Sequence, residues 1–353
     1  MAIKKLNISR PSGKQLIIAS IIAILLMCVC GSLYYYLHRP IIDLKGEKSA
    51  ILYIPTVANF DDVCQLLELD GWLTDKSQFI FMSQLKHYPA HVKAGRFKIS
   101  DGMSAVGLIN MLRSGNQAPV NVTFNNLRTI SQLAGVASRS LESDSAELML
   151  AMTDTSLIGS YGFNNATLPA MFIPNTYQFM WNTDGKQWLE RMNQEYKRFW
   201  TAERIYKADS LELSPVEVSI IASIIEEETN KVDELPIIAG IYLNRLRMGM
   251  PLQACPTLKF ALGNFALRRI LKKDQEVESP YNTYKYAGLP PGPIRIPSIT
   301  AIDAVLNATD HEYLFMCARP DGSGRHNFAR TNAEHARNAA IYQQELNKRK
   351  IYR

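Results

Sequence analysis

An uncharged apolar segment near the N-terminus constrains the fold of this chain more than any other feature. From Leu16 to Leu37 the sequence contains no Asp, Glu, Lys or Arg. A helix of about 20 apolar residues crosses the hydrocarbon core of a bilayer. Within lipid the backbone must satisfy its own hydrogen bonds, which a helix does. We therefore predict a transmembrane helix over residues 16–37, preceded by a tail of residues 1–15.

The residues flanking this segment predict its orientation. Basic residues precede it, namely Lys4, Lys5, Arg10 and Lys14. Positive charge on this side favours a cytoplasmic N-terminus and an exported C-terminal bulk, and Tyr34 to Tyr36 suit an interfacial aromatic belt. A cleaved signal peptide is the alternative. The run is long for a signal peptide, and its Tyr-rich exit does not resemble a small-residue cleavage site.

Length and charge narrow the class of protein. A chain of 353 residues can form two domains with proper cores. The net charge of +6 is modest and the basic residues are dispersed, so nucleic-acid binding has no support. Outside the apolar segment, Cys64, Cys255 and Cys317 form neither a disulfide framework nor a metal signature. One bridge with a free thiol, and three free thiols, both remain open.

The first part of the exported chain reads as a small α+β unit. Alternating residues predict strands over 49–56, 94–99 and 120–124, and apolar stripes with caps predict helices over 59–73, 77–85 and 104–114. This unit has few candidate acids or nucleophiles. We expect it to bind or position a ligand rather than to catalyse a reaction. Residues 129–204 then read as mostly helical, including a helix over 184–200. Pro174 makes 172–179 a loop or an edge strand.

The most informative helix follows. Ser214-Pro215-Val216-Glu217 is a capping box with Pro at the first helical position. The helix continues through an apolar run into Glu226, Glu227 and Glu228. A carboxyl group in a poorly solvated cleft has a raised pKa, which suits a general acid. A solvated acidic turn is the alternative.

A helical wheel separates the glutamates. At 100° per residue, Glu226 extends a stripe of small residues formed by Ser219, Ala222 and Ser223, which a ligand could approach closely. Glu228 falls near the centre of the apolar arc. It is therefore either buried or beyond the end of the helix, and periodicity does not decide between the two.

The remainder alternates helices with irregular segments. We predict a helix over 236–248, irregular segments over 251–257, 281–284 and 288–294, a helix over 297–308, strands over 313–316 and 325–328, and a closing helix over 333–350. Tyrosines and prolines in the irregular segments suit a saccharide or peptide groove. Simple turns held by Pro and Gly are the alternative. No P-loop, GxGxxG, GxSxG, HExxH or CxxC motif is present.

Several motifs in register resemble the YceG-like endolytic murein transglycosylases. They are Ala222–Thr229 (ASIIEEET), Asn244–Met250 (NRLRMGM) with Leu252-Gln253, Pro256-Thr257, Tyr281–Tyr284 (YNTY) and Gly288–Ile294 (GLPPGPI). The resemblance implies an α+β protein with an N-terminal transmembrane helix, a LysM-like α+β module over 47–120, and a mixed α/β YceG-like catalytic domain over 121–353. It also implies a single-pass protein of the bacterial cytoplasmic membrane.

The resemblance further implies cleavage of peptidoglycan glycan strands, with Glu226 as the catalytic acid and Glu228 in support. The substrate-binding or supporting residues expected with Glu228 are Asn244, Arg245, Gln253, Thr257, Tyr281, Asn282, Thr283, Tyr284 and His326. Neither a metal nor a cofactor is expected. Expected partners are glycan strands and the membrane, with peptidoglycan synthases as a further candidate and no nucleic acid.

The chain departs from the family pattern at several positions. Glu227 occupies a position that is often basic, and its charge is expected to raise the pKa of its neighbours. Cys255 and Asn175 each replace an aspartate. Three other functions are kept beside the transglycosylase. They are a hydrolase in which Glu227 or Glu228 activates water, a non-catalytic glycan-binding scaffold, and a lyase of folate synthesis, which the exported topology disfavours.

Overall fold

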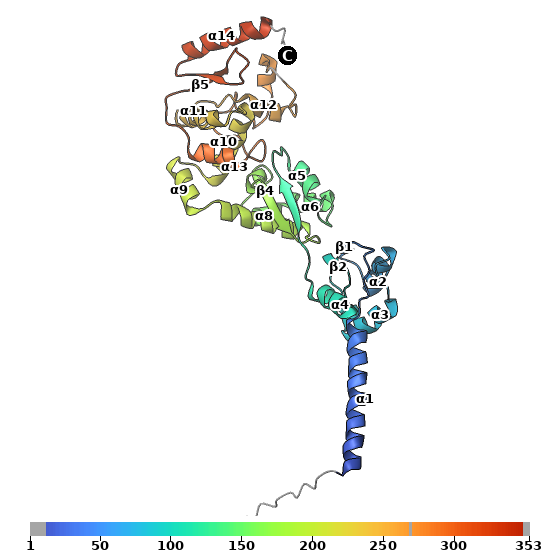
Figure 1. Cartoon of the computed structure of the whole chain (residues 1–353). Helices are drawn as coiled ribbons and strands as arrows, with labels where there is room; N and C mark the ends of the chain where they lie inside the picture. The colour runs from blue at the N-terminus through green and yellow to red at the C-terminus, as the bar shows by residue number, and fades with distance from the viewer. Residues whose placement is uncertain (1–11, 268–269, 349–353) are drawn as a thin grey trace, which may run out of the picture. The chain divides into compact units, whose positions relative to one another are not determined.

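The computed structural model describes residues 12–267 and 270–348, and the chain forms two compact units (Figure 1). The first unit runs to Pro119 and includes Met180–Asn182; the second comprises Val120–Phe179 and the residues from Thr183 onward. The LysM-like and catalytic assignments of the predicted domains stay predictions.

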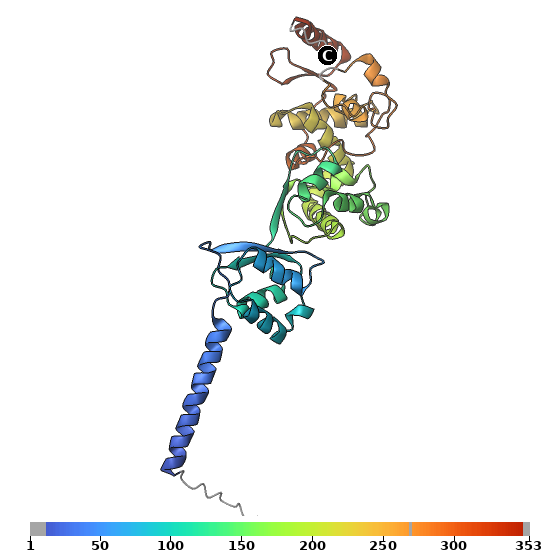
Figure 2. The same ribbon diagram turned by 90° about the vertical axis from the view of Figure 1, so that its right-hand side faces the viewer.

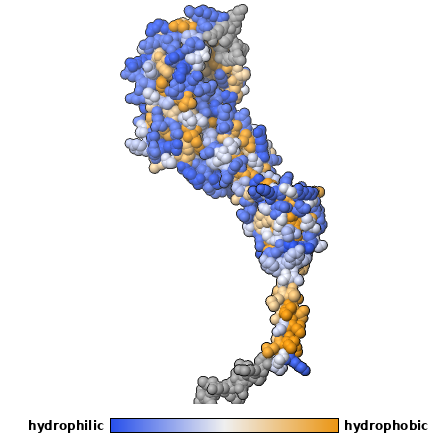
Figure 3. Space-filling model, in the orientation of Figure 1, coloured by the Kyte–Doolittle hydropathy of each residue, from blue (hydrophilic) through white to orange (hydrophobic). Residues whose placement is uncertain are grey.

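The apolar segment forms one long helix, α1 (Gly13–His38), none of whose residues is buried. It is long and apolar enough to cross a membrane, and Figure 3 shows its strongly apolar surface. This finding is consistent with a single-pass anchor, while the orientation stays a prediction. Of the four basic residues preceding the segment, Lys4, Lys5 and Arg10 lie outside the described residues.

The first unit packs three helices against an antiparallel pair of strands (Figure 2). Its elements are β1 (Ser49–Ile54), α2 (Phe60–Leu69), α3 (Lys76–Leu85), β2 (Gly95–Ser100) and α4 (Ala105–Ser114). Leu52 pairs with Phe97 in the register, and both are fully buried in the core. Asn59, the first residue of the predicted helix, caps α2 by accepting from the amides of Asp61 and Asp62. This helix ends four residues early because Gly71, at φ +65°, stops it.

The second unit begins with a strand pair covered by helices. Its elements here are β3 (Val120–Phe124), α5 (Ile130–Ala137), α6 (Ser145–Thr153), α7 (Thr155–Ser160), β4 (Asn175–Phe179) and α8 (Gly185–Phe199). β3 pairs with β4 antiparallel, so the edge-strand alternative for 172–179 is confirmed. Trp188 of α8 is fully buried and packs against Phe172 and Phe179.

A second core surrounds α10 (Pro215–Glu228). Its neighbours are α9 (Ala202–Ser210), α11 (Leu235–Arg247) and α13 (Ile299–Leu306). The predicted capping box is confirmed, because the Ser214 amide donates to Glu217 at 2.7 Å and the Glu217 amide donates back at 3.3 Å.

The prediction that a ligand could approach the small-residue stripe of α10 is wrong. Ser219, Ala222 and Ser223 are fully buried. The protein's own chain covers this face, and the amide of Ile294 donates to Ser223 Oγ at 3.0 Å. Small side chains allow close backbone approach, and here they receive another segment of the same chain.

The last part of the second unit is a hairpin with a helix packed on it. Its elements are α12 (Cys255–Ala261), β5 (Phe315–Ala318), β6 (His326–Ala329) and α14 (Asn332–Lys348). The predicted irregular segment 251–257 is wrong beyond residue 254, because Pro256 occupies the first turn of α12. β5 lies two residues later than predicted, and residues 349 and 350 of the predicted closing helix lie outside the described residues. The 3-10 turns are Tyr88–Ala90, Leu168–Met171, Val232–Glu234 and Lys272–Glu276.

Candidate active site

A cavity of about 370 Å³ lies at the C-terminal end of α10. Its walls come from α10, α11, α12, α14, the segment before α12, the 281–284 segment and the β5–β6 hairpin. The lining residues are Glu228, Ile241, Tyr242, Arg245, Leu252, Gln253, Cys255, Tyr284, Met316, Cys317, Ala318, His326 and His335. Five of the predicted site residues therefore meet in one place: Glu228, Arg245, Gln253, Tyr284 and His326.

Glu228 is the carboxyl group of this cavity. Its Oε1 accepts a hydrogen bond of 2.8 Å from the hydroxyl of Tyr242. Burial raises the pKa of Glu228 and outweighs the Tyr242 hydrogen bond and the nearby His326, which lower it. The charge of Glu227 adds to the rise, as expected, although burial is the larger cause. Burial also raises the pKa of Tyr242 well above its usual value, so the phenol keeps its proton.

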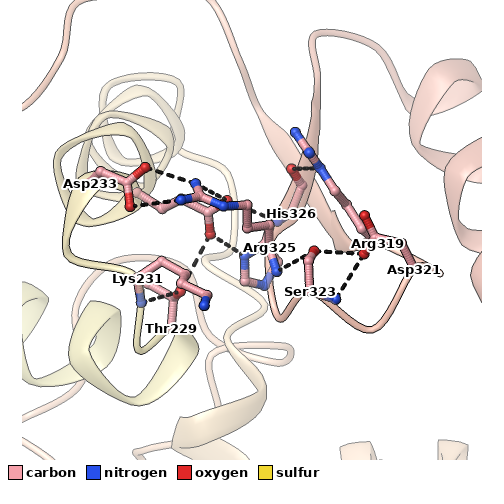
Figure 4. Close-up of polar contacts among 9 residues, drawn as sticks. Thr229, Lys231, Asp233, Arg319, Asp321, Ser323, Arg325 and His326 are labelled. Atoms are coloured by element: carbon pink, nitrogen blue, oxygen red, sulfur yellow. Dashed lines mark hydrogen bonds and ion pairs between the residues drawn. The ribbon is translucent and has the colours of Figure 1, made fainter.

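A buried carboxylate holds His326 at the cavity wall. Glu234 is 3% exposed, and its Oε2 lies 2.9 Å from His326 Nδ1 while its Oε1 accepts from the His326 amide at 3.0 Å. Burial alone would raise the pKa of Glu234, but hydrogen bonds from His326 and Thr229 lower it overall. Figure 4 shows Arg325 pointing toward Asp233 beside His326. The two side chains form an ion pair of 2.7 Å. The histidine is thus fixed by a carboxylate that does not itself line the cavity.

Arg245 shapes the opposite wall through backbone carbonyls. The residue is 7% exposed, and it donates to Leu314 O at 2.7 Å and to Leu252 O at 2.8 Å. It thereby ties the segment before α12 to the chain entering β5. Gln253, at φ +50°, also lies within reach of this guanidinium at 3.4 Å.

The remaining predicted supporting residues brace the walls instead of lining the cavity. Thr283 Oγ1 accepts from the Ala254 amide at 3.0 Å and lies 2.8 Å from Thr257 Oγ1. Asn282 donates to two backbone carbonyls at 2.8 Å each. Asn244 donates to His311 O at 2.7 Å.

Tyr281 and Tyr284 play different parts. The ring of Tyr281 packs on Phe260, with ring centroids 4.7 Å apart. The hydroxyl of Tyr284 lies 3.2 Å from Cys255 Sγ at the cavity wall. All five cysteines of the chain are free, so the option of three free thiols outside the apolar segment is the one observed.

Glu226 and Glu227 lie outside the cavity. The Oε2 of Glu226 accepts from the Ser298 amide at 2.9 Å, at the N-cap of α13. Glu227 is paired with two guanidinium groups, Arg128 at 2.6 Å and Arg295 at 2.7 Å. Its extra charge is therefore balanced locally by residues that lie 99 and 68 positions away in the sequence.

Sequence reasoning missed several residues of this site. The sequence around three of them carries no motif that marks a site: Tyr242, Glu234 and Arg295. Each gains its role from a partner on another element. Cys255 lines the cavity but stood out in the sequence only as a departure from the family pattern, and His335 lines it as well. Among the described residues, no group of three or more His, Cys, Asp or Glu side chains is arranged to hold a metal ion.

The motifs predicted a YceG-like α+β protein, and comparison with known proteins agrees on the family. The model of the YceG-like family matches residues 52–341, and the chain belongs to this family. An endolytic murein transglycosylase of Streptococcus pneumoniae is 28% identical over 85% of this chain, which spans 59% of that relative's length. An endolytic murein transglycosylase of Bacillus subtilis is 26% identical, over 82% of this chain and 84% of its own.

A solved structure is also similar. The crystal structure of a putative YceG-like protein from Listeria monocytogenes aligns with a TM-score of 0.53 and 26% identity, covering 82% of this chain and 98% of that one. The predicted family resemblance is thus confirmed.

Proposed function

We propose that this chain is a membrane-anchored endolytic lytic transglycosylase of peptidoglycan, with Glu228 as its proton donor. The observation that carries the proposal is the placement of Glu228. Its carboxyl group has a raised pKa, lines a cavity and accepts a hydrogen bond from a neutral phenol. A raised pKa lets a carboxyl group hold a proton to higher pH, which suits a general acid. The names of the relatives supply the substrate class.

The reaction needs one carboxyl group used twice. Glu228 donates its proton to the glycosidic oxygen between N-acetylmuramic acid and N-acetylglucosamine, and the bond from that oxygen to the muramic C1 breaks as oxocarbenium-like charge develops. The resulting carboxylate then takes the proton of the muramic C6 hydroxyl. The C6 oxygen bonds to C1 and closes a 1,6-anhydro ring. No water is consumed, and the carboxyl group regains its proton.

The cavity supports this use of Glu228. Tyr242 orients the carboxyl group, and the arginine and histidine walls present polar groups toward a bound sugar. Among the described residues, Glu228 is the one carboxylate that lines the cavity. Glycoside hydrolases usually need a second carboxylate beside the bond. The arrangement therefore favours a transglycosylase over a hydrolase that uses Glu227, whose side chain is held by two arginines elsewhere.

The choice between Glu228 and Glu226 rests on where each side chain lies. The motif favours Glu226 as the acid. The geometry favours Glu228, because Glu226 does not line the cavity and its Oε2 already accepts from the backbone of Ser298. In this proposal Glu226 positions α10 against α13, and Glu228 meets the substrate.

The test compares Glu228→Gln with Glu226→Gln on purified glycan strands, using mass spectrometry of the new chain ends and circular dichroism to verify folding. We expect wild type to release 1,6-anhydro ends, Glu228→Gln to lose at least about a hundredfold in rate, and Glu226→Gln to retain turnover. If Glu228→Gln kept near-normal turnover and Glu226→Gln lost it, Glu226 would be the proton donor. Reducing ends from wild type would indicate a hydrolase, and binding without any product would indicate a scaffold.

We propose further that α1 anchors the chain in the cytoplasmic membrane of a bacterium, with the N-terminus inside and both units exported. Cleavage there would end the elongation of nascent strands, which makes a peptidoglycan synthase a sensible partner. A C-terminal alkaline phosphatase fusion tests the topology. Phosphatase activity in intact cells is expected, and a fusion active only after lysis would contradict it.

A further inference from the structure

A second cavity lies beside the β5–β6 hairpin and takes no part in the proposed chemistry. Its volume is about 380 Å³. It is lined by Tyr313, Phe328, Arg330, Glu334, Arg337 and Asn338. It therefore combines aromatic rings, two guanidinium groups, an amide and the carboxylate of Glu334.

One wall of the second cavity is aromatic. The rings of Tyr313 and Phe328 lie with centroids 5.7 Å apart at 31°. The guanidinium of Arg330 lies 6.0 Å from the centre of the Tyr313 ring. Flat aromatic faces beside polar groups can bind sugar rings and peptide bonds, which have both apolar faces and polar edges.

The other wall offers positive charge that the protein does not neutralise fully. The carboxylate of Glu334 is engaged at the start of α14, where it accepts from the amides of Arg330 at 3.0 Å and Thr331 at 3.4 Å. These backbone hydrogen bonds lower the pKa of Glu334. Among the described residues, Arg337 makes no hydrogen bond or ion pair, and its charge acts on Glu334 only as a smaller contribution to the lowered pKa of that carboxylate. Arg330 pairs with Glu312 at 3.1 Å, but both side chains are more than half exposed, so water weakens this pair.

The two cavities are neighbours along the same elements. On β6, His326 lines the Glu228 cavity and Phe328 lines the second one. Residues two apart on a strand share a face, and these two rings have centroids 6.5 Å apart. On α14, His335 lines the first cavity, and Glu334, Arg337 and Asn338 line the second. A ligand larger than one sugar can therefore occupy both.

We infer that the second cavity is a carboxylate-binding subsite for the peptide stem of the glycan substrate. A guanidinium fork binds a carboxylate with two parallel hydrogen bonds, and Asn338 can pair with a peptide amide. The aromatic wall receives the apolar face of the stem. The inference rests on the proposed function, because it assumes that the ligand of the Glu228 cavity is a peptide-bearing glycan.

Binding to the full chain in detergent micelles tests this subsite. The probes are muramyl dipeptide, which carries one free carboxylate, and the same compound with that carboxylate converted to an amide. Wild type is the background, because muramyl dipeptide contains no glycosidic bond and is not turned over. Isothermal titration then compares Arg337→Gln, Arg337→Lys and the control Lys348→Gln, which removes one positive charge from the same helix.

We expect Arg337→Gln to weaken binding of muramyl dipeptide about tenfold or more, with little change for the amide probe. Arg337→Lys should restore part of the loss because it keeps the charge without the fork. Lys348→Gln should bind both probes like the background. Two results would overturn the inference. The background could bind both probes equally, or Arg337→Gln and Lys348→Gln could bind muramyl dipeptide equally. Absence of anhydro ends from the wild-type enzyme would instead count against the proposed function, so the two failures are distinguishable.

Discussion

The guanidinium of Arg295 lies 2.7 Å from Glu227 Oε1 and is almost completely buried, with 7% of its side chain exposed. The same arginine also donates to Asn126 Oδ1, and its Nε lies 3.6 Å from Glu226 Oε2. Arg128 binds Glu227 from another side at 2.6 Å. These contacts account for a run of three acids at the end of α10. Glu226 and Glu227 hold neighbouring segments, and Glu228 is left to the cavity.

Loss of the Glu227 charge should destabilise the second unit. In Glu227→Gln the Arg295 charge stays buried without its closest carboxylate, and breaking a buried pair in this way costs about 3 kcal/mol of unfolding free energy. Glu203→Gln is the control, because it removes an exposed i,i+4 pair with Lys207 at 3.2 Å and should cost below about 1 kcal/mol. Urea denaturation measures both. Equal unfolding free energies for the two variants would show that the Arg295 pair contributes nothing.

Removal of the Tyr242 hydroxyl should shift the pH dependence of catalysis. The hydrogen bond from Tyr242 lowers the pKa of Glu228, so Tyr242→Phe should raise that pKa further. A general acid is active while protonated, and the high-pH fall of kcat/KM should therefore move to higher pH in Tyr242→Phe. Tyr206→Phe, at a residue that is 74% exposed, should leave the profile unchanged. A shift to lower pH would contradict the assigned role of the hydroxyl.

Stability should depend on the ionisation of Glu228. Its pKa in the folded protein is raised above the ordinary value of 4.5, so the protonated form stabilises the fold and that stability is lost as pH rises through the folded pKa. Glu228→Gln mimics the protonated form. Its melting temperature should match wild type near pH 4 and exceed it increasingly at higher pH. The exposed Glu190→Gln serves as control, and a wild-type protein at least as stable as Glu228→Gln at pH 8 would refute the prediction.

Gly292 should tolerate no side chain. A Cβ atom at this position would lie 1.9 Å from the carbonyl oxygen of Ala166, which is backbone and has little room to move. Gly292→Ala should therefore cost about 1–3 kcal/mol of unfolding free energy. Gly159→Ala is the matched control, because nothing lies within 4 Å of a Cβ atom there and α7 is helical. Thermal melting of both variants measures the difference. Equal melting temperatures would show that the backbone of Ala166 does not exclude a side chain at Gly292.

Local patterns predicted most elements of the fold, because their signals lie within a few residues. Asn59 caps α2, and Gly115 ends α4 at φ +74° as a left-handed cap. The errors have equally local causes. Gly71 stops α2 early, and Pro256 begins α12 where an irregular segment was expected.

The site was predicted less completely. A helical wheel distinguishes the two sides of a helix only when one of them is exposed to solvent. Residues 218–225 of α10 are all buried, so the small-residue stripe and the apolar arc both pack against protein. The wheel consequently predicted that the face carrying Glu226 was open to a ligand. In the structure, the segment around Ile294 covers that face. Glu228 faces a cavity whose other walls come from elements later in the chain. Its hydrogen-bond partner Tyr242, on α11, is 14 residues away in the sequence.

The sequence by itself determined the apolar helix, the capped start of α10, the three acids at its end and the family. Only the tertiary structure decided which acid meets a cavity, because that depends on side chains brought together from distant positions. Glu227 lies between arginines 99 and 68 residues away, and Glu226 accepts from the backbone of Ser298. Hydrogen bonds and burial between distant segments leave no periodic trace in a sequence, and here they distinguish one glutamate from its two neighbours.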